Sequence, residues 1–364
     1  MTHQDILTPN TPTLGFGAMR MPKLDEACKM VDTYLNSGYN YFDTAYVYGG
    51  SEELLNKALV KRHPRSSFML ANKLPSWNVK TPADNDKIFN ESLKRCGLDY
   101  IDFYLIHSLS DGSDQHVQNM GVFEYAFQQK KKGLVKHVGF SFHGTTPYLE
   151  ELLTRHPEVE FVQLQLNYVD IMRGPAGEWQ KLALKHNKPI IVMEPIKGGS
   201  LAALPAPAEA LLKAQDPTRS IASWAMQYAA ALEGVTSILS GMSNLEQVED
   251  NIETFKNLRP LTNEELVLLE KVLQEISKVS TIPCTTCKYC HEHCPKGIDI
   301  ATCFSLYNEG MRDKDGLWNR QSIYGSLLDK EKADKCTACG LCMKHCPQQL
   351  DIPAGLKKAA KLLG

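Results

Sequence analysis

The stretch YNYFDTAYVYGGSEELLNKALVKR, residues 39–62, contains a short aromatic and apolar segment followed by a longer amphipathic one. The first pattern predicts a buried β-strand over 39–45, and the second predicts a helix over 51–62. The same alternation of strand and helix occurs eight times along the chain. It indicates parallel strands joined by helical crossovers, and eight units in about 250 residues predict a closed (β/α)8 TIM barrel.

The expected strands are 13–19, 39–45, 67–73, 101–107, 137–142, 161–167, 189–195 and 237–242. The expected helices are 25–37, 51–62, 84–96, 122–132, 148–156, 178–187, 220–232 and 244–257. An open, doubly wound sheet is the alternative fold, and it usually carries G-x-G-x-x-G after its first strand. Here Gly15 and Gly17 are followed by Met19 and Arg20 instead of a third glycine, which disfavours that fold.

Composition limits the class of protein. The chain has 364 residues, 43% hydrophobic and 23% charged, with a formal net charge of −2. No long Lys/Arg block is present, so we expect neither a nucleic-acid nor an anionic-membrane partner. The polar N-terminus lacks the apolar region of a signal peptide, and no apolar run has the length of a membrane helix. We therefore expect a cytoplasmic protein, in a compartment that disfavours disulfides.

The composition changes near residue 280. A last amphipathic helix is expected over 261–278, with Thr262 as its N-cap and Glu265 three residues later. Nine of the eleven cysteines follow it. We therefore predict two domains, a barrel over 1–278 and a small, mainly helical cysteine-rich domain over 279–364.

Reactive side chains occur at the ends of three successive expected strands. Asp43 ends the second strand and Tyr48 lies in the loop after it, Lys73 ends the third strand, and His107 ends the fourth. Each alone has an ordinary explanation as a cap, a packing residue or a solvated side chain. In a (β/α)8 barrel, however, the carboxyl ends of the strands form the active-site mouth. We therefore expect these four side chains to lie together.

The four form a chemically sensible set for carbonyl reduction, which needs a hydride donor and a proton donor. A free tyrosine has a pKa near ~10. A neighbouring ammonium such as Lys73 stabilises the tyrosinate, and Asp43 would hold that ammonium in place. A histidine can donate a hydrogen bond to the carbonyl oxygen and orient it.

The segment FDTAYVYGGSE, the end of the strand at Lys73 and LDYIDFYLIH resemble the motifs of the aldo-keto reductase family, and the resemblance runs from about residue 12 to 275. It implies a (β/α)8 barrel that binds a nicotinamide cofactor across its mouth. It also implies a catalytic tetrad at the positions that match the motifs, namely Asp43, Tyr48, Lys73 and His107. Tyr48 would be the general acid/base.

The resemblance also implies a set of cofactor contacts. Ser141 and Gln163 match the carboxamide-binding positions, although Phe142 stands where the family usually has Asn. EPIKGGSL resembles the loop around the pyrophosphate, and SGMSNLEQVEDN resembles the segment around the adenosine. The full set of expected contacts is Gly17, Met19, Ser141, Gln163, Pro195, Lys197, Gly199, Gly241, Gln247 and Asn251.

The choice between NADH and NADPH is left open by these positions. Members that prefer NADPH place basic residues at the positions of Gly241 and Gln247, to pair with the 2′-phosphate. This chain has neither, and Glu246, Glu249 and Asp250 are nearby. Without a guanidinium the extra phosphate loses a charge-assisted partner. NADH is therefore at least as favoured as NADPH.

The motif C-x2-C-x2-C-x3-C-P occurs twice, at residues 284–295 and 336–347. Zinc, disulfides or iron–sulfur clusters could account for cysteines at this density. Structural zinc prefers two separated Cys/His pairs, whereas this spacing is typical of [4Fe–4S] ligation. In two-cluster ferredoxins the fourth cysteine of each run binds the other cluster. The predicted ligands are Cys284, Cys287, Cys290 and Cys346 for one cluster, and Cys336, Cys339, Cys342 and Cys294 for the other.

The tail resembles helical dicluster ferredoxins, with FSLYNEG in a helical connector between the two runs. Cys28 and Cys96 are expected to be packing residues, and Cys303 lies outside the ligand pattern. His291 and His293 are expected to be solvated. Trp77, shortly after Lys73, is a candidate wall of the substrate pocket.

Three functions fit these observations. The first is an NAD(P)H-dependent oxidoreductase that interconverts a small carbonyl and an alcohol, with two [4Fe–4S] clusters that relay electrons to a ferredoxin or flavin partner. The second is an ordinary reductase whose clusters are structural or sense oxygen. The third is an electron-transfer module in which the barrel is only a scaffold. The complete tetrad argues against the third.

Overall fold

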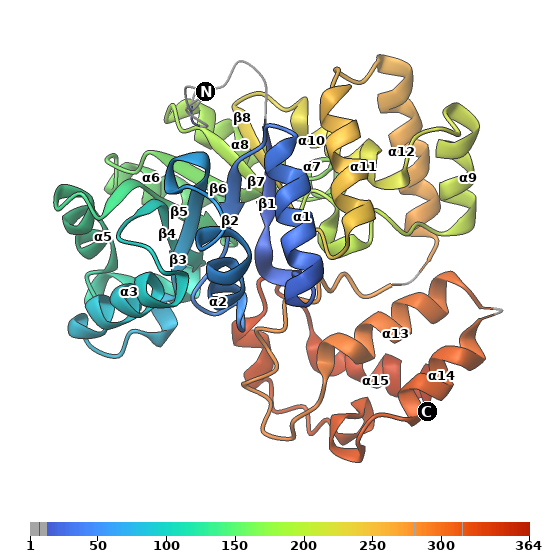
Figure 1. The fold of residues 1–364 in the computed structure, drawn as a ribbon. Coiled ribbons are helices and arrows are strands. Elements are labelled where there is room, and N and C mark those ends of the chain that lie inside the picture. The colour runs from blue at the N-terminus through green and yellow to red at the C-terminus, as the bar shows by residue number, and fades with distance from the viewer. Residues whose placement is uncertain (1–6, 8–12, 280, 315) are drawn as a thin grey trace. The chain divides into compact units, whose positions relative to one another are not determined.

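The computed structural model of the chain describes residues 7, 13–279, 281–314 and 316–364. Eight parallel strands form a closed barrel in the order of the sequence (Figure 1). They are β1 (Thr13–Gly17), β2 (Tyr41–Asp43), β3 (Met69–Leu74), β4 (Ile101–Leu109), β5 (Val135–Phe142), β6 (Phe161–Gln165), β7 (Ile190–Met193) and β8 (Val235–Ser240). The barrel closes where Gly15 of β1 pairs with Leu239 of β8. The predicted (β/α)8 barrel is confirmed, and the open sheet is excluded by this pairing.

All eight predicted helices are present. They correspond to α1 (Leu24–Asn36), α2 (Ser51–Leu55), α3 (Pro82–Cys96), α5 (Val122–Lys131), α6 (Thr146–Arg155), α8 (Ala176–Lys185), α10 (Ile221–Ala230) and α11 (Leu245–Lys256). The expected helix over 51–62 changes after Leu55 into a π-helical turn, Asn56–Val60. At this turn the Asn56 amide donates to the carbonyl oxygen of Arg95 at 2.8 Å.

Between β1 and α12 (Asn263–Ser277) the structure also contains three helices that were not predicted, namely α4 (Asp114–Asn119), α7 (Tyr168–Arg173) and α9 (Ala206–Gln215). The first two have six residues each and depend on packing, because helices this short are unstable alone. The sequence of α9 does contain a pattern that predicts a helix, because Pro207 lies in its first turn and good helix formers follow. The predicted last helix is α12 (Asn263–Ser277). Its capping box is confirmed, because Thr262 and Glu265 each accept a hydrogen bond from the other's backbone N–H.

The interior of the barrel is filled by apolar side chains from several of its strands. Phe103 packs edge-on against Tyr41 and Phe161, with ring centroids 5.2 and 5.5 Å apart. Ala71, Leu105, Ile191 and Leu239 complete this buried cluster. The barrel is therefore packed solid below the carboxyl ends of its strands, and the polar side chains gather at those ends.

By internal contacts the chain forms two compact units. One comprises Met1–Pro195 with Ser223–Leu261, and the other comprises Ile196–Ala222 with Thr262–Gly364. The segment after β7, together with α9 and α12, therefore groups with the cysteine-rich tail. Within this second unit Arg219 forms an ion pair with Glu265, with 3.3 Å between Nη1 and Oε1.

The tail contains α13 (Ile300–Arg312), α14 (Leu317–Gly325) and α15 (Ile352–Leu363). α13 includes FSLYNEG, so the helical connector is confirmed. The repeated flanks of the cysteine runs act as helix caps, because Asp299 caps α13 and Asp351 caps α15. Phe304 of α13 and Leu356 of α15 lie in one buried core with Cys290 and Cys342.

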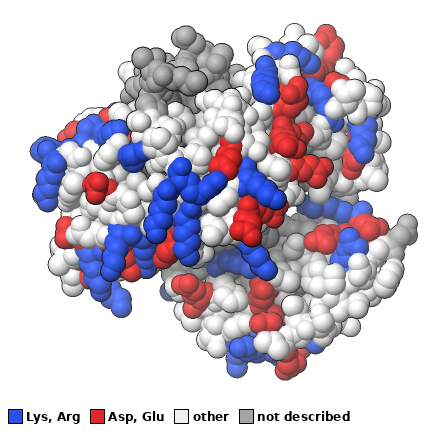
Figure 2. All heavy atoms as spheres, viewed as in Figure 1, with Lys and Arg blue, Asp and Glu red and all other residues white. Residues whose placement is uncertain are grey.

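The surface shows no field of a single sign on the face drawn in Figure 2, where basic and acidic side chains are interspersed. Among the described residues, no helix combines the length and the apolar character that crossing a bilayer requires.

Candidate active site and cluster-binding sites

The structure brings the four predicted catalytic side chains together at the carboxyl ends of β2, β3 and β4. Lys73 is fully buried and Asp43 is 4% exposed. The Lys73 ammonium donates to Asp43 Oδ1 at 2.6 Å and to the carbonyl oxygen of Thr44 at 2.7 Å. Two acceptors therefore fix the ammonium at the point where the chain leaves β2 for the loop that carries Tyr48.

Tyr48 and His107 complete this group. The Lys73 Nζ lies 5.0 Å from the centre of the Tyr48 ring. The Tyr48 and His107 rings meet edge to face with centroids 5.7 Å apart, and the Trp77 and His107 ring centroids lie 5.2 Å apart. The phenol and the indole therefore both contact the imidazole, close to the ion pair.

Burial and charge set the protonation states of these groups. Burial lowers the pKa of Lys73, but Asp43 and Tyr48 more than offset this, so the pKa lies above its ordinary value. Burial raises the pKa of the Asp43 carboxyl, and the Lys73 ammonium opposes that rise. Burial, followed by the charge of Lys73, holds the pKa of His107 well below its usual value. The site therefore combines a charged lysine with a neutral histidine, which can donate a hydrogen bond.

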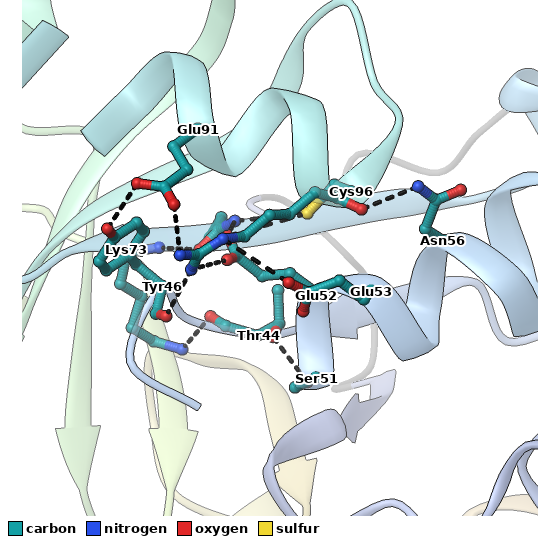
Figure 3. Close-up of polar contacts among 11 residues, drawn as sticks. Thr44, Tyr46, Ser51, Glu52, Glu53, Asn56, Lys73, Glu91 and Cys96 are labelled. Atoms are coloured by element: carbon teal, nitrogen blue, oxygen red, sulfur yellow. Dashed lines mark hydrogen bonds and ion pairs between the residues drawn. The ribbon is translucent and has the colours of Figure 1, made fainter. Parts of the chain in front are cut away.

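A polar network anchors the loop between β2 and α2, as Figure 3 shows. The Tyr46 hydroxyl donates to Glu91 of α3 at 2.7 Å, and the Arg95 guanidinium lies 4.4 Å from the centre of the Tyr46 ring. Arg95 also pairs with Glu91 and with the buried Glu52, at 2.5 and 3.2 Å. This network holds the loop at a residue two positions before Tyr48.

A second set of contacts connects the network to Lys73. The Asn72 amide donates to Glu52 Oε1 at 2.7 Å, and its carbonyl oxygen accepts from the Lys73 backbone N–H at 2.8 Å. On the other side, the Thr44 and Ser51 hydroxyls lie 2.8 Å apart, and Ser51 donates to the carbonyl oxygen of Ala18. Sequence spacing predicts none of these partners, because they come from separate strands and helices.

In the tail, two cavities are each lined by four cysteines. One, with about 330 Å³ of open volume, is lined by Cys284, Cys287, Cys290 and Cys346. The other, with about 320 Å³, is lined by Cys294, Cys336, Cys339 and Cys342. Each therefore takes three thiols from one run and the fourth from the other, as expected for [4Fe–4S] ligation. The donor sets fit two clusters.

The two runs share backbone details that suit a cluster. Thr286 and Ala338 have φ values of 56° and 54°, and their N–H groups donate to the sulfurs of Cys284 and Cys336 at 3.4 Å. Burial and then the neighbouring thiols raise the pKa of Cys290. A bound cationic iron centre would offset that cost and stabilise the thiolate.

The remaining cysteine and histidine side chains have varied surroundings. All eleven cysteines have free thiols. Within the described parts of the chain, no group of three or more His, Cys, Asp or Glu side chains is placed to hold a metal ion. His293 is half-buried and stacks on His345, with ring centroids 3.3 Å apart, so it is not simply solvated. Cys96 is buried as expected, whereas Cys28 is only half-buried.

Comparison with known proteins assigns a family to each of the two parts of the chain. Residues 13–274 match the model of the Aldo/keto reductase family, which is more than half of the chain.

The chain belongs to the aldo/keto reductase family.

Residues 283–350 match a 4Fe-4S dicluster domain, so this aldo/keto reductase also carries an iron–sulfur domain.

Individual relatives cover the barrel. An uncharacterized oxidoreductase of Bacillus subtilis, YqkF, is 26% identical over 293 residues, which is 71% of this chain and 91% of the relative. L-galactose dehydrogenase of Arabidopsis thaliana is 25% identical over 73% of this chain and 92% of its own length. The holo form of an aldo-keto reductase from Bacillus halodurans superimposes with a TM-score of 0.61 and is 27% identical, covering 72% of this chain and 92% of that one. The protein is thus an oxidoreductase of this family.

Several expected cofactor contacts of the aldo/keto reductase lie on the strands of its barrel. Ser141 and Gln163 are neighbours in register on β5 and β6 and are buried. Gln163 Oε1 is buried and accepts no hydrogen bond from the protein, so it fits the amide group of a nicotinamide. The Ser141 hydroxyl accepts from the Ser108 backbone N–H at 2.7 Å. Phe142 packs among aromatic side chains, 5.4 Å from Trp179.

The expected adenosine end lies around β8. A Cβ on Gly17 would meet the carbonyl oxygen of Ser240 at 3.1 Å, so this glycine permits the close approach of β1 and β8. The Asn251 amide donates to Ser240, and Gln247 accepts from the Ser243 backbone N–H. The Arg20 guanidinium, which sequence reasoning missed, lies 3.7 Å from the position of a Cβ on Gly241.

Of the remaining expected contacts, Pro195 is buried, whereas Met19, Lys197 and Gly199 are half-buried. Met19 and Pro195 belong to the unit that contains the barrel strands, whereas Lys197 and Gly199 belong to the unit that contains the tail. One residue outside the predicted set is His143, which is buried directly after β5. Its charge affects His107, and burial lowers the pKa of His143 to about 4. Its position two residues after Ser141, in the GFSFHG segment, is the sequence signal that places it near the site.

Proposed function

We propose that the protein interconverts a small carbonyl compound and its alcohol with NAD(P)H, using Tyr48 as general acid/base. The observation that carries this proposal is the buried Lys73–Asp43 pair, whose ammonium lies beside the Tyr48 ring next to a neutral His107. That arrangement suits proton transfer at a carbonyl oxygen.

The residues divide the chemistry among them. Asp43 keeps the Lys73 ammonium charged and in place, and the ammonium stabilises negative charge on the Tyr48 oxygen. His107 donates a hydrogen bond to the substrate oxygen and orients it. In reduction Tyr48 gives its proton to the developing alkoxide, and in oxidation it takes the proton back. The nicotinamide, when bound, supplies or accepts the hydride.

The proposed nucleotide contacts follow the expected set. Ser141 and the unsatisfied Gln163 Oε1 would bind the carboxamide, which has both a donor and an acceptor. Pro195, Lys197 and Gly199 would surround the pyrophosphate. Gly17, Met19, Gly241, Gln247 and Asn251 would line the rest of the nucleotide site. Because Arg20 places a guanidinium beside Gly241, the comparison of NADH with NADPH should include an Arg20→Gln variant.

We further propose that the two cysteine-lined cavities hold two [4Fe–4S] clusters, in a tail domain over 279–364 that follows a barrel domain over 1–278. The clusters, when bound, exchange single electrons, and a ferredoxin or flavin partner would fit that role. A cytoplasmic setting would keep the cysteines reduced.

A second candidate function is that of an ordinary carbonyl reductase with structural or oxygen-sensing clusters. It is favoured by the position of the cavities, because their cysteines belong to the same buried core as Phe304 and Leu356. Loss of iron would then disturb the tail without touching the chemistry at Tyr48.

Anaerobic titration of the iron-loaded protein with NADH and with NADPH tests these proposals. Nucleotide binding is followed by fluorescence, and the clusters by their visible absorbance. Binding accompanied by bleaching supports electron relay, whereas binding with constant absorbance supports the second candidate. Failure to bind either nucleotide contradicts the proposed oxidoreductase activity.

A further inference from the structure

The loop after β7, residues 196–200, has an unusual backbone. Lys197, Gly198 and Gly199 have φ values of 48°, 66° and 101° in succession. Glycine adopts positive φ without strain, but Lys197 does not, so its surroundings must hold it there. Hydrogen bonds within the loop partly stabilise this backbone conformation. The N–H groups of Gly199 and Leu201 both donate to the Ile196 carbonyl oxygen, at 3.0 and 3.1 Å.

The loop is also held from outside, by the first cysteine run. A Cβ placed on Gly198 would lie 2.6 Å from Thr285 Cα and 2.8 Å from its carbonyl oxygen, so only glycine permits this approach. Both residues belong to the same compact unit. Thr285 is 2% exposed, and it also lines the cavity formed by Cys284, Cys287, Cys290 and Cys346. One residue therefore touches the loop and the first cluster site.

The second cysteine run provides an internal comparison. Thr337 stands between Cys336 and Cys339 as Thr285 stands between Cys284 and Cys287. Thr337, however, is exposed, whereas Thr285 is buried. The cysteine motif itself therefore does not require this threonine to be buried. Burial of the threonine distinguishes the first run from the second.

We propose that Thr285 is a positioning residue that couples the first cluster site to nucleotide binding. A ligand that orders Cys284–Cys287 would hold the backbone of Thr285 in place. Because Thr285 packs against Gly198, it would also hold the loop conformation at Lys197 and Gly199. This inference rests on the proposed function, in which Lys197 and Gly199 bind the pyrophosphate. Because coupling between two sites is reciprocal, bound nucleotide must also favour the ordered form of the first cysteine loop.

A pair of matched substitutions tests the proposal. Thr285→Leu adds volume against Gly198, whereas Thr337→Leu adds the same volume at the exposed equivalent. Overpacking at the buried position should weaken the Kd and raise the KM for NADH or NADPH about tenfold. The kcat at saturating nucleotide should stay within about twofold, because the tetrad is untouched. Thr337→Leu should leave the Kd and KM unchanged.

Iron and sulfide content and visible absorbance are measured for both variants. A Thr285→Leu protein with full iron content and the nucleotide affinity of the wild type overturns the proposal.

Hydrogen exchange on the wild-type, iron-loaded protein provides a test that needs no variant. Saturating NADH or NADPH should slow exchange of the amides at 285–287 and leave those at 337–339 unchanged. Equal behaviour of the two segments, with nucleotide demonstrably bound, overturns the coupling. Wild-type protein that binds neither nucleotide instead refutes the proposed function, so the two failures are distinguishable.

Discussion

The barrel and the cysteine-rich tail position their functional side chains in different ways. In the barrel, hydrogen-bonded strands fix Asp43 and Lys73, and the charges of Lys73 and Asp43 satisfy each other within the protein. In the tail, turns with left-handed residues arrange the cysteines around open cavities. The barrel site thus satisfies its own charges, whereas we expect the tail to be stabilised by what its cysteines bind.

Removal of iron should produce the largest difference between the barrel and the tail. Anaerobic chelation should unfold the tail, because four thiols face each cavity and the core around them is small. The barrel, with its closed sheet, should keep its structure. Hydrogen exchange followed by peptide checks this, since amides in α13 and α15 should lose protection while those in β3 and β4 keep it. Retained protection in α13 would contradict the prediction.

Tyr48→Phe should abolish most of the reductase activity while leaving the tail intact. Loss of the proton donor should lower kcat by about 10²- to 10⁴-fold, the usual contribution of general acid catalysis. Steady-state assays of carbonyl reduction measure this, and iron content and visible absorbance serve as the control. If the variant retained wild-type kcat, Tyr48 would have no role in proton transfer.

Acidification should weaken the barrel through His143. Its pKa is about 4 in the folded protein, against an ordinary value near ~6.5 when unfolded. Between these values the unfolded chain binds the extra proton, so stability is present above pH ~6.5 and falls as the pH drops toward 4. The stability of wild type relative to His143→Gln should fall by about 3 kcal/mol over this range. Denaturant titrations at several pH values measure this difference, and parallel curves would exclude His143 as the cause.

The smallest effect is expected from the network that anchors the Tyr48 loop. Tyr46→Phe removes the hydrogen bond to Glu91 and should cost about 1 kcal/mol of stability, with a few-fold loss of kcat because Tyr48 is less well placed. Tyr125→Phe is the matched control, because its hydroxyl donates to Asp86 at 3.0 Å on α3, away from that loop. If both variants lost kcat equally, the loop would not depend on this network.

The features predicted correctly from the sequence are those that depend on local residue patterns. Alternating segments predicted the barrel, and strand ends brought Asp43, Lys73 and His107 to one mouth because the strands are parallel. The cysteine spacing also predicted that each cavity would be lined by three cysteines of one run and the fourth of the other.

Features that depend on tertiary contacts were missed. Tyr46 and Arg95 are far apart in the sequence, and no spacing rule joins them. Thr285 and Thr337 occupy equivalent positions in two nearly identical motifs, yet only one is buried. Burial of that kind is decided by which distant segment packs there, and here it is the loop that contains Gly198.

The exchange of fourth cysteines has a consequence for how the protein is made. Cys284, Cys287 and Cys290 leave the ribosome early, but the cavity they line also needs Cys346, the last cysteine of the chain. The other cavity is complete once Cys342 has been added. The site that begins first is therefore finished last, and a cluster could occupy it only after Cys346 has been synthesised. A full complement of iron would then mark a molecule whose translation had passed Cys346.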